Sequence, residues 1–287
     1  MNFISLIGIL LSLILLNGCG DSNLPKYVEL NTMRVLDLTA SDGSGNAEFA
    51  AGDTVTISPL ISDINNSGSL SYVASACMDP GVAYGSEPTC EGSSSLVNLA
   101  SGSVTSVTSA NNFTGVANTF TVTLPSSAII FASRSSKEQY NGVSYLVTYQ
   151  LNSSDGRQVK SFKRLIVSTK TTKNKNPVVS DVFSNGVSLS GITTLPLGGP
   201  VTLSLQFGSV GVESYSQMQA DGSLKTGTEE LSTTWFISDG SLKYYRTVNL
   251  ATNEYTGPSA AVAGRKSFII TVTRDGRGGS TITKKEF

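Results

Sequence analysis

The sequence predicts an all-β protein, and three observations predict it. Polar and apolar residues alternate in short runs, as in 54–57 and 201–207, and a period of two is that of a half-buried strand. Serine, threonine, glycine and valine are the most frequent residues after residue 20, which suits short strands joined by polar turns. No long helix-forming segment follows residue 20.

Taken in chain order, the pattern predicts strands separated by polar turns, of which 40–46 and 65–68 are the first two. A polar stretch at 133–141 has room for one short helical turn. Strands are expected at 28–36, 54–57, 69–76, 96–99, 104–107, 119–124, 143–151, 159–167, 178–183, 201–207, 231–237, 267–273 and 280–285.

The chain is long enough for two domains of ordinary size. Residues 169–176 contain no apolar side chain and precede Pro177, so they predict a linker, with lysines that fit a solvated connector better than a partner surface. We therefore expect one domain over 27–168 and a second over 177–287. Each ends in the same pattern, a strand followed by Asp155-Gly156 or Asp275-Gly276 and another strand, as in a hairpin whose glycine takes a positive φ.

The amino-terminal segment is apolar but short. Residues 3–16 are almost unbroken isoleucine, leucine, phenylalanine and glycine, fewer than the ~20 that a membrane-spanning helix needs. The segment ends Leu16-Asn17-Gly18-Cys19, which resembles the lipobox of bacterial lipoprotein signal peptides. The resemblance implies that 1–18 is a signal peptide, that Cys19 is acylated with chains such as palmitate, and that 19–26 is a tether.

Two features depart from that pattern. The first five residues contain no lysine or arginine, and Asn17 is not the usual small residue. An uncleaved anchor helix and a secretory signal that is cut elsewhere therefore remain alternatives. Where the lipoprotein pattern holds, Gly20 rather than aspartate after the cysteine implies the outer membrane, on its periplasmic or surface side. Two or more acyl chains would anchor the protein stably, since one chain binds only marginally.

The two remaining cysteines are Cys77 and Cys90. In an exported chain, two cysteines this close predict a disulfide, which would contribute about 3 kcal/mol in the chain-entropy account. A two-thiolate metal site and a redox pair are the alternatives, but neither finds its other ligands or a C-x-x-C spacing.

The chain contains no histidine and few charges. The absence of histidine excludes Ser-His-Asp and Cys-His catalysis and every imidazole metal site. With a charged fraction of 14% and a net charge of −1, the chain has no broad positive electrostatic potential that would attract nucleic acid. We expect no cofactor, no metal and no catalytic residue. Plain turns fit 42–46 and 275–277 better than calcium loops, and the adjacent Glu229 and Glu230 would point to opposite faces of a strand.

Several short motifs resemble the immunoglobulin-like or PKD-like modules of bacterial surface lipoproteins. In the second half they are 229–231, 234–238 and 273–279, and in the first half 53–56, 70–72 and the Cys77 to Cys90 loop. The resemblance implies two tandem Ig-like Greek-key β-sandwich domains, with Trp235 in a core. It implies no activity.

Together these features predict a non-enzymatic cell-envelope lipoprotein that displays β-sandwich modules for binding, adhesion or structural support. Its partners would be a lipid bilayer, through acylated Cys19, and an unidentified protein or glycan. The alternative is an enzyme or enzyme accessory that acts on envelope polysaccharide. A deep cleft lined by acids and aromatic residues would favour that alternative, and a flat surface would favour binding.

Overall fold

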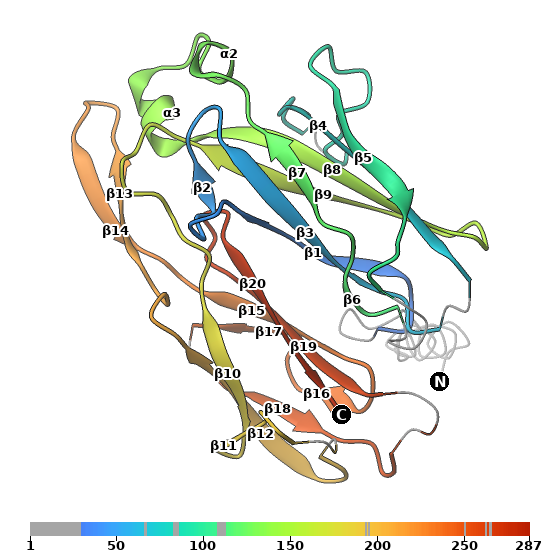
Figure 1. The fold of residues 1–287 in the computed structure, drawn as a ribbon. Helices are drawn as coiled ribbons and strands as arrows, with labels where there is room; N and C mark the ends of the chain where they lie inside the picture. The colour runs from blue at the N-terminus through green and yellow to red at the C-terminus, as the bar shows by residue number, and fades with distance from the viewer. Residues whose placement is uncertain are drawn as a thin grey trace, which may run out of the picture.

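The protein is all-β, as predicted. The computed structural model describes residues 30–65, 68–82, 86–107, 113–192, 194, 196–249, 251–261, 263 and 266–287 (Figure 1). Cys19, the lipobox and the tether lie outside these ranges, so the anchor stays a prediction. Within the described ranges, two short helices, α2 (Ser127–Ile130) and α3 (Ser136–Asn141), interrupt the strands.

Strands β1 to β9, here called the first module, form two facing sheets. One has the order β1-β3-β6, with β7 also paired to β3, and the other has the order β2-β9-β8-β4-β5. All described pairs in them are antiparallel except β2 with β9. The strands are β1 (Arg34–Ser41), β2 (Glu48–Phe49), β3 (Thr54–Ser62), β4 (Leu70–Met78), β5 (Val97–Ser103), β6 (Gly115–Val116), β7 (Phe120–Thr123), β8 (Val143–Ser153) and β9 (Gln158–Val167).

Strands β10 to β20, the second module, form two more facing sheets and a separate hairpin. The sheets have the orders β11-β10-β12-β18-β16 and β17-β15-β19-β20, and the hairpin is β13-β14. The strands are β10 (Val179–Ser184), β11 (Val187–Ser188), β12 (Pro200–Phe207), β13 (Ser214–Met218), β14 (Leu224–Thr228), β15 (Ser232–Ile237), β16 (Ser241–Leu242), β17 (Arg246–Val248), β18 (Asn253–Thr256), β19 (Phe268–Arg274) and β20 (Ser280–Glu286).

The core of the first module follows from the predicted alternation. Alternate residues of β4 and β8 point inward, and three aromatic rings stack there. The Tyr149 ring lies 5.6 Å from Tyr72 and 6.1 Å from Phe120, measured between centroids. These rings join residues of both sheets in one buried cluster, so the two layers share a core.

Both Asp-Gly hairpins form as predicted. Gly156 joins β8 to β9 with a φ of +91°, and Gly276 joins β19 to β20 with a φ of +74°. Only glycine adopts this left-handed backbone without strain. The helical turn predicted at 133–141 is α3, in which the side chains of Ser135 and Glu138 cap each other's backbone N–H groups.

The second module buries Trp235 in its core, as predicted. The indole is fully buried between the two sheets, with Tyr255 of β18 and Leu203 of β12 in the same cluster. Its Nε1–H donates a hydrogen bond to the Thr247 hydroxyl at 2.9 Å. The indole therefore has the polar partner that a buried tryptophan needs.

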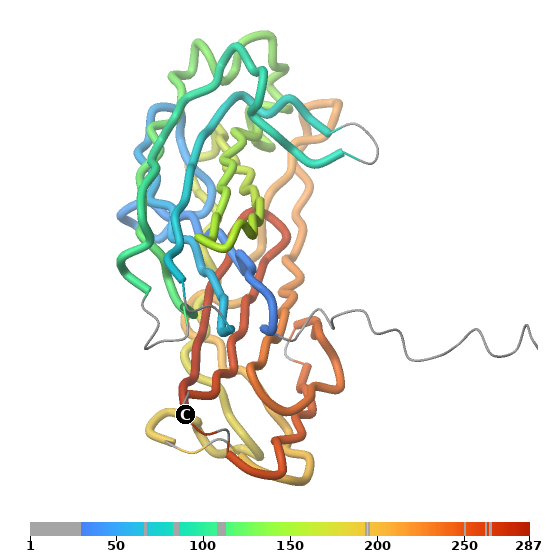
Figure 2. Tube along the Cα trace, turned by 90° about the vertical axis from the view of Figure 1, so that its right-hand side faces the viewer, coloured from blue at the N-terminus to red at the C-terminus, as the bar shows by residue number. Residues whose placement is uncertain are grey.

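A third apolar core joins the two modules. Phe236 follows Trp235 on β15 and so points to the opposite face of its sheet. There it packs with Phe268 and Ile270 of β19 against Leu36 and Leu60 of the first module. Figures 1 and 2 show the C-terminal hairpin extending along β1. Because β15 and β19 are buried on both faces, the four sheets stack as consecutive layers.

A β-bulge in β1 serves both cores. The pairing with β3 shifts between Val35 and Asp37, so Leu36 is an extra residue. As a result Leu36 packs in the junction, whereas Leu38 packs in the first module. Asp37 also faces the junction, where it accepts hydrogen bonds from Arg274 at 2.8 Å and from the Ser280 hydroxyl at 2.7 Å.

The segment 169–176 differs from the solvated connector that we expected. Lys170 pairs with Glu48 at 3.2 Å and its side chain is only 9% exposed. The Lys173 ammonium donates to the Phe49 and Ser168 carbonyls, and Asn174 is buried. Lys170, Lys173 and Asn174 are therefore held by neighbouring segments, while the threonines of this stretch are exposed. Sequence composition does not reveal this difference.

The β13-β14 hairpin was not predicted, and it reaches from the second module to α3. Asn141 at the end of α3 exchanges two hydrogen bonds with the Met218 backbone, at 2.8 and 2.9 Å. The segment 104–107, expected as a strand, is not one. Tyr244 and Tyr245 are both exposed, because they lie in a bend between β16 and β17 and not on a strand.

Asp181 of β10 is held by several donors in the second module. Burial by itself raises the pKa of Asp181. Hydrogen bonds donated by the Ser188, Lys285 and Ser190 side chains lower the pKa by more, so it lies well below the usual value of 3.8. Lys285 lies at 2.9 Å from this carboxylate and ties β20 to β10. The ionised carboxylate therefore supports the packing of the two sheets.

Among the residues that the structure describes, none of the helices combines the length and the apolar character needed to cross a membrane.

Candidate functional site

The Cys77–Cys90 disulfide forms as predicted, and it fixes a loop over the outer face of the first module. The two Cα atoms are 5.6 Å apart and the cysteines are 13 residues apart in sequence. Both cysteines are buried against Leu146 of β8. The outer face of the β2-β9-β8-β4-β5 sheet is therefore covered at this point. A largely antiparallel sheet commonly leaves one face exposed to water.

Two further contacts hold the ends of the loop. The Asp79 carboxylate accepts a hydrogen bond from Arg164 of β9 at 2.6 Å, and the Ser95 hydroxyl accepts one from the Met78 backbone N–H at 3.0 Å. The described ends of the loop are thus attached to β4 and to β9. Together with the disulfide they hold the Glu87–Glu91 segment over the sheet.

The floor beneath the loop is set by strand register. Ser75 of β4 lies opposite Thr148 of β8, and Thr148 lies opposite Phe162 of β9. The Ser75 and Thr148 hydroxyls are 2.8 Å apart and share a hydrogen bond. One step along, Gln150 lies opposite Lys160. These residues occupy the outward phase of the strands whose inward residues build the core.

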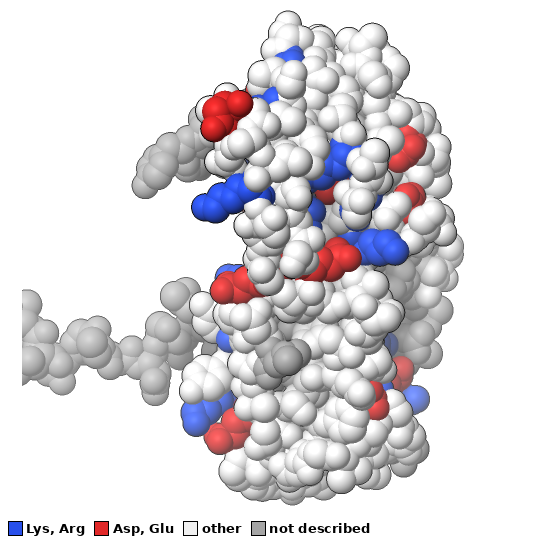
Figure 3. All heavy atoms as spheres, turned by 90° about the vertical axis from the view of Figure 1, so that its left-hand side faces the viewer, with Lys and Arg blue, Asp and Glu red and all other residues white. Residues whose placement is uncertain are grey.

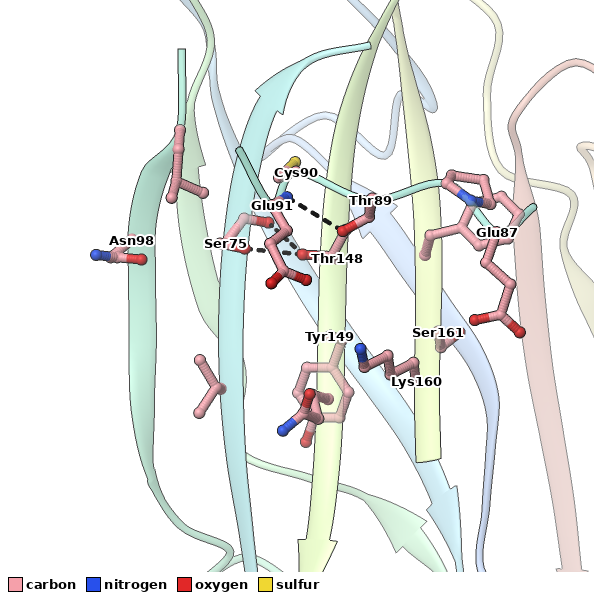
Figure 4. Close-up of a pocket in the computed structure, with 15 residues that line it drawn as sticks. Ser75, Glu87, Thr89, Cys90, Glu91, Asn98, Thr148, Tyr149, Lys160 and Ser161 are labelled. Atoms are coloured by element: carbon pink, nitrogen blue, oxygen red, sulfur yellow. Dashed lines mark hydrogen bonds between the residues drawn. The ribbon is translucent and has the colours of Figure 1, made fainter. Parts of the chain in front are cut away.

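Loop and floor enclose a groove of about 550 Å³, within the size range of small-ligand sites. The segment Glu87–Glu91 forms its roof, and Asn98 of β5 lies at one side (Figure 4). Leu96, just before β5, also lines the groove. Three exposed apolar side chains contribute to it, namely Val73 at 46%, Leu96 at 44% and Phe162 at 44% exposure. The groove is thus both apolar and polar.

Charges of both signs face this groove. Figure 4 shows the Glu91 side chain extending from the roof over β4 and β8, the Glu87 side chain extending beside β9, and Lys160 reaching from β9 between the two carboxylates. Both carboxylates are exposed. The arrangement is suited to binding.

The sequence did not single out this groove, although one signal was present. In the alternating run Lys160-Ser161-Phe162-Lys163-Arg164, Phe162 occupies the same phase as Lys160 and Arg164. An aromatic ring in the charged phase of a strand indicates either a buried outer face or a contact surface. The disulfide loop was predicted, but which face it covers depends on the fold.

The acidic turns considered for calcium are satisfied by their own loops. The Asp42 carboxylate accepts hydrogen bonds from the Ser44 and Asn46 backbone N–H groups and from the Asn46 side chain. Asp275 accepts from the Arg277 and Gly279 N–H groups in the same way. Within the described ranges, no three potential metal ligands come together.

Glu229 and Glu230 diverge, although they lie in the connection between β14 and β15 and not on a strand as expected. Glu230 is exposed, whereas Glu229 is buried and pairs with Arg277 at 2.6 Å. Burial raises the Glu229 pKa, while hydrogen bonds from the Glu213 backbone and from Arg277 oppose the shift. This glutamate is part of the junction between the modules.

A second polar cluster that the sequence did not reveal surrounds Glu48 at the junction. The Glu48 side chain is 2% exposed and lies 3.2 Å from Lys170 and 3.4 Å from Arg277. The Arg277 guanidinium also covers the Tyr215 ring at 4.3 Å. Figure 3 views the molecule from the left-hand side of Figure 1 and shows lysine and arginine beside acidic side chains across the middle of that face. Since its cations are paired with carboxylates, we assign this cluster a structural role.

The comparisons with known proteins give no identity. The chain matches no protein-family model and no curated protein sequence. Among solved structures it is similar, at a TM-score of 0.26 and 9% identity, to dimeric latent PorU from Porphyromonas gingivalis, over 90% of this chain and 24% of that one.

Two other solved structures are similar at the same level. The tandem V-type regions of VCBP3, a v-region-containing chitin binding protein, give a TM-score of 0.26 at 12% identity, over 89% of this chain and 98% of that one. A mutant of Salmonella alpha-2-macroglobulin gives 0.26 at 10% identity, over 89% and 16%. Values this low carry no argument about function, which must come from the groove itself.

Proposed function

We propose that this chain is a non-enzymatic, lipid-anchored protein of the cell envelope, which binds a partner in the groove between the Glu87–Glu91 loop and the outer face of its first module. In this proposal each module is an Ig-like Greek-key β-sandwich. The observation that carries the proposal is the disulfide, because it fixes a loop over an outward sheet face and so creates a groove of about 550 Å³.

The proposed anchor is acylated Cys19, which would hold the protein on the outer membrane. Leu30 is buried in the junction between the modules, so the chain reaches the folded part eleven residues after Cys19. An extended chain of that length spans at most roughly 40 Å. The tether would therefore hold the junction between the modules within roughly 40 Å of the membrane that carries the acyl chains.

The anchor is tested by labelling. Cells that express the Cys19→Ala chain should incorporate no labelled palmitate into it, whereas the Cys77→Ala/Cys90→Ala chain should be labelled like the wild type. Equal labelling of the Cys19→Ala chain would exclude this anchor.

The groove is tested by photocrosslinking in intact cells. A photoreactive amino acid in place of Gln150, on the groove floor, should give a discrete crosslinked species. The same residue in place of Lys225, which is exposed on β14, is the matched control and should give none. Identical patterns from both positions, or no product at Gln150, would contradict binding in the groove.

A second candidate is an enzyme or accessory that acts on envelope polysaccharide. The observation in its favour is that Glu87, Glu91 and Phe162 line one groove, so two acids and an aromatic ring do come together. Polysaccharide turnover that is lost in the Glu87→Gln and Glu91→Gln variants would support it. The exposure of both carboxylates favours binding instead.

A further inference from the structure

We infer that the groove takes a short, extended peptide segment of about four residues that carries a basic side chain and a carboxylate. This inference rests on the proposed binding function and names its ligand class. Three properties of the groove support it: its span across the sheet, its charges, and the mixture of amide and apolar groups on its floor.

The span of the groove fixes the length of the ligand. The groove crosses neighbouring strands in the order β9-β8-β4-β5, from Phe162 to Asn98. Adjacent strands are about 4.8 Å apart, so three steps cover about 14 Å. The roof segment Glu87–Glu91 runs across the strands in the same direction (Figure 4). An extended peptide rises about 3.3 Å per residue, so about four residues fill this span.

The charges favour a ligand that carries both signs. Glu87 and Glu91 project from the roof, while Lys160 projects from the floor between them. No ion pair joins Lys160 to either glutamate among the described residues, although all three line the same groove. A ligand with an ammonium or guanidinium group near the roof and a carboxylate near Lys160 would complement this pattern, whereas a neutral ligand would leave it unused.

The uncharged polar residues of the groove match a peptide backbone. Gln150 and Asn98 have side-chain amides, which both donate and accept hydrogen bonds, and the Ser75 and Thr148 hydroxyls do the same. A peptide bond presents one N–H donor and one C=O acceptor per residue. The exposed Phe162 and Val73 side chains give an apolar surface on which a ligand side chain can pack.

The test measures binding of labelled probes to the full-length protein in detergent micelles by fluorescence anisotropy. The first probe is the capped peptide Lys-Val-Gly-Glu. The second is Gln-Val-Gly-Gln, which has the same length without charge. The third is maltotriose, a neutral glycan of similar span. We expect the charged peptide to bind more tightly than either of the other two.

Charge reversal in the groove makes the test specific. The Glu87→Lys/Glu91→Lys chain should bind the charged peptide more weakly, by roughly fivefold for each ion pair lost, as expected for exposed pairs. Lys160→Glu should weaken it to a similar extent. Lys225→Glu on β14 is the control and should change nothing. Thermal melting of each variant shows that the fold is retained, since all these side chains are exposed.

Each outcome decides the inference. Loss of binding in the groove variants alone supports it. Equal binding of the charged and neutral peptides, binding of maltotriose in place of the peptides, or no binding by any probe overturns the peptide class. A groove-specific crosslink at Gln150 would still stand in those cases, so the proposed binding function would survive. Absence of that crosslink would remove both.

Discussion

The junction between the modules makes a measurable prediction at Glu48. Its carboxylate is 2% exposed and is shared by Lys170 at 3.2 Å and Arg277 at 3.4 Å. The substitution Glu48→Gln keeps the size of the side chain and removes the charge. Two cations that are only 9% and 17% exposed would then lose their common anion.

The size of the effect follows from this burial. Breaking a buried ion pair by removing one partner lowers the free energy of unfolding by about 3 to 5 kcal/mol. Arg277 keeps Glu229 at 2.6 Å, so we expect the lower end, about 3 kcal/mol. For a chain of this size that corresponds to a fall in melting temperature of roughly 6 to 12 °C. The double variant Glu48→Gln/Lys170→Met should lose less than the sum of its single changes, because no unpaired ammonium stays buried at that site.

The assay is urea and thermal unfolding of the purified chain. The matched control is Glu254→Gln, since the Lys243–Glu254 pair is 3.8 Å long with side chains 53% and 48% exposed. Exposed pairs of this kind contribute about 0 to 1 kcal/mol. If Glu48→Gln and Glu254→Gln unfold at the same denaturant concentration, the argument that the buried cluster stabilises the junction is wrong.

Three other parts of the molecule give expected outcomes. Replacing Cys77 and Cys90 by serine should lower the free energy of unfolding by about 3 kcal/mol, measured by urea denaturation. Without the bridge the unfolded chain gains conformational entropy, and a loop of this length accounts for that amount. Thr247→Val should lower it by about 1 to 3 kcal/mol, measured by Trp235 fluorescence, because the buried indole N–H loses its acceptor. The free energy of unfolding should also fall below about pH 4. The pKa of Asp181 is lower in the folded protein than in the unfolded chain. The ionised carboxylate therefore stabilises the fold at a pH above the unfolded-state pKa, and this contribution is lost as the carboxylate takes up a proton. Asp181→Asn should lack this part of the acid-induced loss.

Each of these outcomes has a control within the chain. Reductant should destabilise the wild type but not the serine variant, and equal sensitivity would contradict the disulfide account. Thr247→Ser keeps a hydroxyl and should preserve more stability than Thr247→Val. For the acid titration, an Asp181→Asn curve that runs parallel to the wild-type curve would rule out the role given to that carboxylate.

Local patterns in the sequence predicted much of the fold. The alternation in 201–207 predicted β12, and the apolar run at 267–273 predicted β19, because side-chain direction in a strand has a period of two. Asp155-Gly156 and Asp275-Gly276 predicted two hairpins from the conformational freedom of glycine. Short elements with little apolar content, such as the β13-β14 hairpin, escaped because their strand character depends on contacts with α3 and Arg277.

The candidate site could be predicted only in part. The proximity of Cys77 and Cys90 predicted the bridge, since two neighbouring cysteines in an exported chain have few other uses. That the bridge closes a groove over Phe162 and Thr148 depends on the order of four strands, which come from distant parts of the sequence. Neither composition nor spacing contains that order.

The features that could be predicted from the amino-acid sequence are therefore local: the strand class, the turns, the disulfide, and the expectation of a lipid anchor at Cys19. Which faces of the sheets are covered depends on the three-dimensional fold. In the fold, Trp235 and its neighbour Phe236 pack in two different cores. Polar residues of the segment 169–176 contact the junction, and the Glu87–Glu91 segment lies over the outer face of the β9-β8-β4-β5 strands. The physical reason is that periodicity sets the direction of each side chain along its strand, whereas burial depends on which distant segment packs against that side.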